Sequence, residues 1–182
     1  RLIPMQGDPA QRKKHIYLVG FSGSGKSRTG ARLAAVLNYR FIDLDAMIAD
    51  RMHASIEVIF ECHGEHRFRA EETRALEHCS HMNRPAVIAV GGGAVERKTN
   101  RLIMQQTGIM IYLKCSLREL RRRLRGTTDR PLLRGTRSSV AAVRTLLNRR
   151  KPLYETADIM VITSGKPVSH VVKRIADRVA QI

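Results

Sequence analysis

The sequence predicts a three-layer α/β/α fold, in which helices cover both faces of a five-stranded parallel sheet. Two observations carry this prediction. Short apolar segments of strand length alternate with longer segments whose apolar residues recur at helical spacing, which is the order expected of β-α-β units. The first apolar segment also runs directly into a glycine-rich loop followed by a helical segment, which is the order found at phosphate-binding sites.

The five predicted strands are short apolar segments bounded by polar residues or glycine. They span residues 16–19, 41–44, 86–90, 109–113 and 159–162. The predicted helices span residues 28–37, 46–82, 96–106, 117–125, 140–154 and 168–179, and the second of them is interrupted at His63-Gly64. In parallel sheets of this kind, ligands bind beyond the carboxyl ends of the strands.

The glycine-rich loop carries the strongest functional signal. Residues 20–27 read GFSGSGKS and match G-x-x-x-x-G-K-[ST] at every fixed position. The backbone N–H groups around Gly23, Ser24 and Gly25 are expected to converge on phosphate oxygens, helped by the helix N-terminus. Lys26 is expected to reach the β- and γ-phosphates of ATP, and the Ser27 hydroxyl to bind Mg²⁺.

Length and segment order indicate one domain. Of the 182 residues, 43% are hydrophobic, and we expect a loose leader over 1–13 and a single domain over 14–182. The segment 46–82 is too long for a simple crossover and predicts an inserted helical subdomain that covers a co-substrate. The cationic, glycine-flanked segment 126–137 predicts a mobile lid, whose closure would exclude water from a phosphoryl-transfer site.

Composition narrows the classes of partner and compartment. The net charge of +17 is typical of proteins that bind nucleic acid. However, the chain has only eight Phe and Tyr residues and no Trp, which are too few aromatic side chains for a surface on which bases stack. We therefore expect no nucleic-acid binding. No apolar run approaches the ~18 residues of a membrane span. Three cysteines without a C-x-x-C pattern favour reduced thiols in the cytoplasm. We expect a monomer.

Two carboxylates follow the second predicted strand. Asp43 and Asp45 lie two residues apart, so in an extended segment they would point the same way. One could act through Mg²⁺ while the other accepts a hydrogen bond from a substrate hydroxyl; the alternative is that they cap the following helix. Since the segment 86–90 is followed by glycines and not by a carboxylate, Asp43 is expected to contribute more to the metal site.

Arginines supply the other candidate groups. Arg69 and Arg150 would form a carboxylate clamp if the fold brings them together, because their planar forks bind carboxylates in a bidentate way. Arg130, inside the predicted lid, could stabilise charge on the transferring phosphate. Arg123 could pack its guanidinium against the adenine. The glycine triplet at 91–93 would offer N–H donors without side-chain obstruction.

Taken in order, these motifs resemble the shikimate kinase family. They are the phosphate loop, Asp-Leu-Asp at 43–45, Gly-Glu-x-x-Phe-Arg-x-x-Glu at 64–72, Gly-Gly-Gly-Ala-Val at 91–95, Arg-Pro-Leu-Leu at 130–133 and Arg-x-Pro-Leu-Tyr at 150–154. The resemblance covers 14–182. It implies a P-loop kinase fold like that of nucleoside monophosphate kinases, and MgATP-dependent phosphorylation of the 3-hydroxyl group of shikimate.

The resemblance also implies roles for individual residues. The substrate-binding set would be Asp45, Arg69, Gly91, Gly92, Gly93 and Arg150. The remaining residues would form the ATP and metal side, with Ser27 and Asp43 at Mg²⁺, Arg123 against the adenine, and Arg130 as the catalytic arginine of the lid. Lys26, Asp45 and Arg130 are therefore the predicted catalytic residues.

Two alternatives remain open at this stage. The chain could be another small-molecule kinase of the same fold, acting on gluconate or a nucleoside monophosphate, or a non-catalytic P-loop module that binds RNA or a protein. One local departure from the family pattern is His53, since the family often has glycine before the Ser-Ile pair at 55–56.

Overall fold

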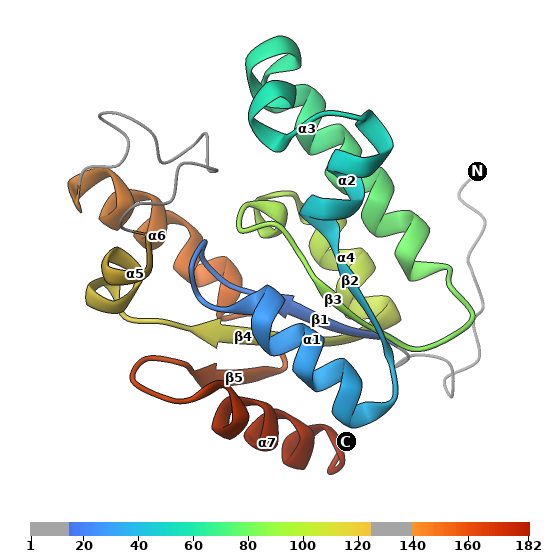
Figure 1. The fold of residues 1–182 in the computed structure, drawn as a ribbon, viewed down its shortest axis with the longest axis vertical. Helices are drawn as coiled ribbons and strands as arrows, with labels where there is room; N and C mark the ends of the chain where they lie inside the picture. Colours follow the sequence, from blue (N-terminus) through green and yellow to red (C-terminus); the bar gives the residue numbers. More distant parts are fainter. Residues whose placement is uncertain (1–14, 125–139) are drawn as a thin grey trace.

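Five parallel strands form a single sheet at the centre of the molecule (Figure 1). The structure is a computed structural model that describes residues 15–124 and 140–182. The strands are β1 (His15–Val19), β2 (Arg40–Asp43), β3 (Ala86–Ala89), β4 (Gly108–Lys114) and β5 (Ile159–Ile162). Their spatial order is β2-β3-β1-β4-β5, so the predicted parallel α/β sheet is confirmed.

Helices connect and follow these strands. They are α1 (Lys26–Leu37), α2 (Leu44–Met52), α3 (Ile56–Ser80), the 3-10 turn η2 (Ala94–Glu96), α4 (Lys98–Thr107), α5 (Leu117–Leu124), α6 (Val140–Tyr154) and α7 (Val168–Val179). The helix predicted over 96–106 instead begins at Lys98, because η2 and the extended Arg97 (φ −82°, ψ 125°) come between the glycine triplet and α4.

Alternation along the strands produces two hydrophobic cores, one on each face of the sheet. In β1, Tyr17 and Val19 face a core that also contains buried residues of α3, α4 and α6. Ile16 and Leu18 face the other core, which contains buried residues of α1 and α7. Because both faces are covered, β1 is buried throughout, and the three-layer architecture follows.

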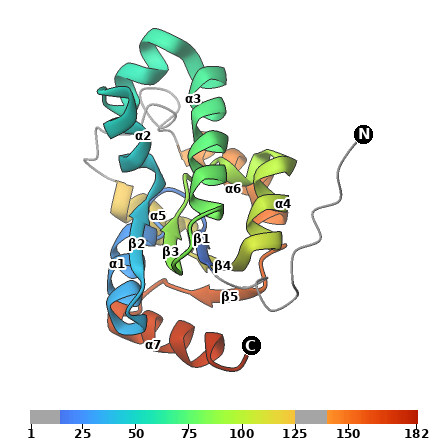
Figure 2. The same cartoon turned by 90° about the vertical axis from the view of Figure 1, so that its right-hand side faces the viewer.

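The segment predicted as one interrupted helix forms two helices. α2 ends at Met52, and the capping residue His53 adopts the left-handed conformation (φ 49°). Glycine adopts this conformation at less cost, which explains why a glycine suits this position. Ser55 then caps α3 by accepting a hydrogen bond from Val58 N. The predicted interruption is present, since Gly64 (φ 75°) kinks α3. In Figures 1 and 2, α2 and the first part of α3 stand away from the sheet.

Three predictions lie outside the described residues: the leader over 1–13, the lid over 126–137, and Arg130 within that lid. Among residues 15–124 and 140–182, none of the helices has both the length and the apolar character that crossing a membrane requires.

Candidate active site

The carboxyl ends of three neighbouring strands bring the predicted motifs together. β2, β3 and β1 are adjacent in the sheet. β2 ends at Asp43 and leads into α2, the glycine triplet comes after β3, and the phosphate loop comes after β1. Segments far apart in the sequence therefore meet at one edge of the sheet, as expected for a ligand site in this class of fold.

The phosphate loop is a tight turn that leads into α1. Ser24 N donates to Phe21 O (3.0 Å), and Gly23 (φ 82°) and Gly25 (φ 99°) adopt conformations that favour glycine. No side chain caps the N-terminus of α1, so its first N–H groups are available to an anion. Lys26 Nζ donates to the loop carbonyls of Gly20 (2.8 Å) and Phe21 (3.2 Å), which holds the ammonium group at the loop.

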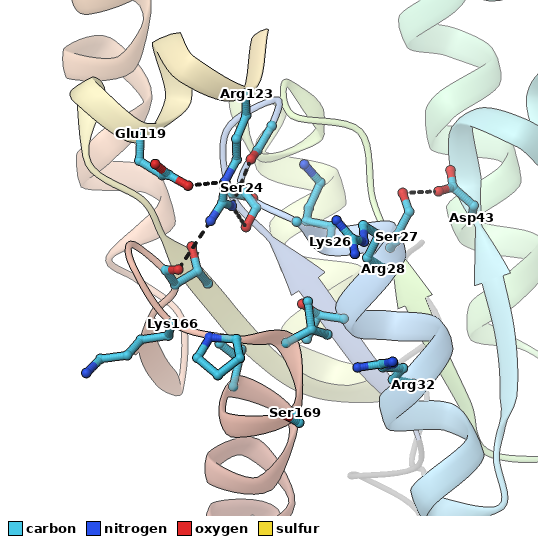
Figure 3. A pocket seen from close by; sticks show the side chains of 18 of the residues that line it. Ser24, Lys26, Ser27, Arg28, Arg32, Asp43, Glu119, Arg123, Lys166 and Ser169 are labelled. Carbon is cyan, nitrogen blue, oxygen red and sulfur yellow. Dashed lines mark hydrogen bonds and ion pairs between the residues drawn. The ribbon is translucent and has the colours of Figure 1, made fainter.

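Ser27 and Asp43 face each other across this edge (Figure 3). Ser27 Oγ donates to Asp43 Oδ2 at 2.5 Å. The second oxygen of Asp43 caps α2 by accepting from Asp45 N (3.1 Å) and Ala46 N (3.4 Å). Asp43 therefore caps a helix and faces the phosphate loop at the same time.

The predicted geometry of Asp45 is wrong, although its location at the site is not. β2 ends at Asp43 and α2 begins at Leu44, so Asp45 lies in the first turn of a helix and not two residues along a strand. The cap that Asp43 forms starts the helix early. Asp45 instead approaches the glycine triplet, because a Cβ atom at Gly91 would lie 2.9 Å from Asp45 Oδ1.

A cleft of about 900 Å³ lies beside the phosphate loop (Figure 3). One wall consists of residues 23–27 and the start of α1, and Asp43 and Asp45 also line it. The opposite wall consists of α5 residues and the segment after β5, and it includes Glu119, Arg122, Arg123, Thr163, Gly165, Lys166, Pro167 and Ser169. The volume suits a small-molecule ligand such as a nucleotide.

Arg123 lines this cleft and is held by the protein backbone. Its Nη1 donates to the carbonyls of Gly23 and Ser24 (both 3.2 Å), and its Nη2 donates to Thr163 O (3.3 Å). Glu119 Oε1 accepts from its Nε at 2.7 Å. The guanidinium thus joins the phosphate loop to the opposite wall of the cleft, which is a connection that the sequence did not reveal.

Arg69 occupies the other side of the glycine triplet. It is only 7% exposed and forms ion pairs within α3 to Glu65 (3.1 Å) and Glu72 (2.9 Å). Glu72 is fully buried. Since a buried ion pair needs further hydrogen bonds to offset desolvation, Glu65 and Glu72 together hold the Arg69 guanidinium in place.

Arg150 approaches the same buried carboxylate from α6. It is 3% exposed, donates to Glu96 Oε1 (2.9 Å) and lies over the Phe21 ring at 6.0 Å. The charges of Arg69 and Arg150 both act to lower the pKa of Glu72, so both guanidinium groups lie near one carboxylate. The structure therefore brings the two remote arginines to one region.

Close packing explains two glycines of the triplet. A Cβ atom at Gly91 would lie 2.3 Å from Glu72 Oε1, and one at Gly93 would lie 2.3 Å from Arg69 Nη2. Neither contact is possible without a shift, because real Cβ atoms do not come this close. Gly92 lies against the phosphate loop, since its Cβ atom would be 3.3 Å from Ser22 N, and its carbonyl accepts from Tyr154 Oη at 2.5 Å.

Comparison with known proteins identifies the family. The family model for shikimate kinase matches residues 22–180. This chain belongs to the shikimate kinase family. A shikimate kinase of Geobacter sulfurreducens is 41% identical over 163 residues, which cover 90% of this chain and 89% of the relative. One from Chlorobium chlorochromatii is 40% identical, with 96% and 93% covered.

Solved structures agree with this assignment. Shikimate kinase from Acinetobacter baumannii in complex with shikimate has a TM-score of 0.88 and 33% identity, with 94% of this chain and 95% of that chain covered. A gluconokinase from Sinorhizobium meliloti has a TM-score of 0.59 and 18% identity, with 93% and 97% covered, which shows the fold alone. The predicted family, the P-loop kinase fold and the enzyme class, an ATP-dependent kinase, are confirmed.

Several residues of this shikimate kinase site escaped the sequence analysis. Glu72 ends one of the family motifs and lies three residues after Arg69, a spacing that predicts a helical ion pair, yet it was given no role. The segment 163–169 follows the carboxyl end of β5, which is a usable signal for a ligand wall. Glu119 lies three and four residues before Arg122 and Arg123, a spacing that also predicts helical ion pairs. Glu96 carries no local signal, because its partners on α6 are identified only by the fold.

The buried carboxylate of Glu72 predicts a pH dependence of stability. Burial raises the pKa of Glu72 from 4.5 to about 7, although the charge and hydrogen bond of Arg69 oppose this. Between these values the folded protein holds a proton that the unfolded chain releases, so the free energy of unfolding should fall as pH rises from about 4.5 to 7. Urea titrations of the parent and Glu72→Gln should give a flatter pH profile for the variant; parallel profiles would contradict this origin.

The packing at Gly93 predicts a selective effect on substrate binding. A Gly93→Ala change should displace the Arg69 guanidinium, because the new methyl group would overlap it. We expect the KM for shikimate to rise about tenfold, the loss associated with one hydrogen bond to a charged group, with the KM for ATP nearly unchanged. Initial rates at varied shikimate and ATP measure both constants, and equal changes in the two would point to a general disturbance of the fold.

Proposed function

We propose that this chain transfers the γ-phosphoryl group of ATP to the 3-hydroxyl group of shikimate. The observation that supports this most directly is that Arg69, Arg150 and Asp45 all lie near the buried carboxylate of Glu72, beside the glycine triplet and the phosphate loop. Two guanidinium groups suit a substrate carboxylate, and a carboxylate suits a ring hydroxyl. The related Acinetobacter baumannii enzyme was solved in complex with shikimate, which also supports the proposal.

In this proposal the substrate is oriented by its carboxylate. Arg69 and Arg150 hold that group, the N–H groups of the triplet at 91–93 contribute further donors, and Asp45 accepts a hydrogen bond from the reacting hydroxyl. Orientation of this kind lowers the free-energy barrier of phosphoryl transfer by a large amount. The hydroxyl oxygen forms a bond to the γ-phosphorus, the bond from that phosphorus to ADP breaks, and the hydroxyl proton passes to Asp45.

The phosphate loop holds the nucleotide. The N–H groups around Gly23, Ser24 and Gly25 bind phosphate oxygens, and Lys26 neutralises charge on the β- and γ-phosphates. Arg123 is assigned to the adenine, which its place in the cleft permits. The assignment of Arg130 as the catalytic arginine of a lid stays a prediction, since that residue lies outside the described part of the chain.

Ser27 and Asp43 fit a Mg²⁺ site. A hydroxyl and a carboxylate oxygen lie together at the phosphate loop, and Mg²⁺ prefers oxygen ligands of these kinds. The described residues contain no group of three or more His, Cys, Asp and Glu side chains that could hold a metal, which suits an ion that takes its other ligands from phosphates and water. When bound, the ion neutralises charge that develops on the phosphates.

We also propose a cytoplasmic monomer that does not use nucleic acid as a partner. Cys62, Cys79 and Cys115 are free thiols, which supports a reducing compartment. The basic charge is partly used in ion pairs such as Arg69 with Glu72 and Arg150 with Glu96.

A substrate comparison tests the function. Purified protein is incubated with MgATP and shikimate, gluconate or a set of nucleoside monophosphates, and ADP release is followed. Shikimate alone should stimulate ADP formation, and phosphorus NMR should show a phosphomonoester at the 3-position. Stimulation by gluconate or a nucleoside monophosphate instead would assign a different kinase, and no stimulation together with salt-sensitive RNA binding would indicate a non-catalytic module.

A further inference from the structure

Glu96 connects two neighbouring arginines of α6 to the turn that follows the glycine triplet. Arg150 Nε donates to Glu96 Oε1 at 2.9 Å. Arg149 donates to the same oxygen through Nη2 (2.6 Å) and Nε (3.1 Å). The side chain of Arg149 is 64% exposed and that of Arg150 only 4%, so the two ion pairs differ: one lies at the surface and the other at the proposed substrate site.

The contact with Glu96 uses only one edge of the Arg150 guanidinium. The Phe21 ring lies 6.0 Å from its central carbon, and Glu96 engages Nε. Nη2 is buried and forms no hydrogen bond within residues 15–124 and 140–182. A buried donor of a charged group is costly unless a partner is supplied. A substrate carboxylate supplies such a partner, and it accepts from the terminal nitrogens of an arginine in a bidentate way.

The charge on Glu96 is secured by its partners. Partial burial is the largest single influence and opposes ionisation, but the hydrogen bonds and charges of Arg150 and Arg149 together lower the pKa of Glu96. The carboxylate is therefore ionised at neutral pH and acts only as an acceptor. The Glu96 carboxylate can therefore hold Nε of Arg150, and the terminal nitrogens of the guanidinium keep their N–H donors for the substrate.

We propose that Glu96 is a positioning residue, which holds Arg150 by Nε so that the terminal nitrogens of that arginine face the substrate carboxylate. The inference rests on the proposed function, in which Arg150 binds that carboxylate. A second contact, from Tyr154 Oη to Gly92 O (2.5 Å), ties α6 to the same loop. Arg150 also forms a side-chain hydrogen bond with Tyr154. Removal of Glu96 therefore frees Nε of Arg150, while the connection between α6 and the loop remains.

Substitution of Glu96 separates positioning from general stability. In Glu96→Ala, the KM for shikimate should rise about tenfold, the loss of one hydrogen bond to a charged group, while kcat and the KM for ATP stay within about twofold. Glu96→Gln should give a smaller rise, because its amide oxygen can still accept from Nε. Thermal unfolding measurements check that both variants fold. If Glu96→Ala does not fold, Glu96→Gln still tests the positioning role.

The chain offers a matched control on α3. Glu71 Oε1 also accepts from two arginines, Arg67 at 3.1 Å and Arg74 at 2.8 Å, and both of these are exposed. Glu71→Ala removes the same kind of bridge away from the proposed substrate carboxylate, so it should leave the KM for shikimate unchanged. An increase equal to that of Glu96→Ala would show that loss of any such bridge has this effect, and would overturn the inference.

A double-mutant cycle with Arg150→Lys distinguishes the positioning role of Glu96 from the carboxylate clamp. If Glu96 acts through Arg150, Glu96→Ala should have little further effect when lysine is present at position 150. Additive effects would overturn the positioning role while leaving the carboxylate clamp intact. A lower KM in Glu96→Ala would show that Glu96 competes with the substrate for Arg150, which also overturns it. If Arg150→Lys alone changes nothing, the proposed clamp fails and the inference fails with it.

Discussion

Replacement of Lys26 by alanine is expected to lower kcat/KM about a hundredfold or more. The structure holds the ammonium group of Lys26 at the loop through the carbonyls of Gly20 and Phe21, where it can neutralise the phosphates of ATP. Loss of one preorganised donor to developing charge commonly reduces turnover by about 10²–10³. Steady-state rates with saturating shikimate and varied ATP measure the effect, and we expect shikimate affinity to change little.

A second cation at the same cleft provides the control for Lys26. Lys166 also lines the cleft but lies on the segment after β5, so Lys166→Ala changes the charge without altering the loop. We expect its effect on kcat/KM to stay below about threefold, as for exposed charges. Normal turnover in Lys26→Ala, or equal losses in both variants, would show that the loop lysine has no specific role.

Replacement of Arg150 by lysine is expected to raise the KM for shikimate by about tenfold to a hundredfold. Lysine keeps the positive charge but lacks the planar fork that binds a carboxylate at two points. Loss of a hydrogen bond to a charged group costs about 1.5–3 kcal/mol, and each 1.4 kcal/mol is about tenfold in affinity. The KM for ATP should remain near that of the parent.

The neighbouring arginine allows a direct comparison with Arg150→Lys. Arg149 forms its ion pair with the same oxygen of Glu96, but its side chain is exposed. Arg149→Lys therefore changes the same chemical group without reaching the proposed substrate. We expect shikimate kinetics like those of the parent, and a rise equal to that of Arg150→Lys would mean that the clamp does not discriminate between the two arginines.

Features that depend on neighbouring residues could be predicted from the sequence. The apolar alternation predicts all five strands, and the loop pattern predicts the phosphate site, because both arise from local spacing. The cap that Asp43 forms on α2 was one of the two alternatives predicted for that residue. The error at Asp45 shows the limit of such reasoning, since a single cap decides whether the chain continues as a strand or turns into a helix.

Features that depend on tertiary contacts could not be predicted in the same way. That Arg69 and Arg150 lie in one region followed only from resemblance, because α3 (Ile56–Ser80) and α6 (Val140–Tyr154) are far apart in the sequence. The contact of Glu96 with Arg150 joins residues on separate elements, and no pattern near Glu96 indicates it. Arg123 is similar, because its contacts with the phosphate loop and Thr163 O exist only once the cleft has formed.

A crystal structure of the protein with shikimate, ADP and Mg²⁺ tests the central claim most directly. The difference density should place the substrate carboxylate between the guanidinium groups of Arg69 and Arg150, with a ring hydroxyl at hydrogen-bonding distance from Asp45 and directed toward the phosphate loop. Density for shikimate at any other place, with these two arginines still bonded only to glutamates, would contradict the account.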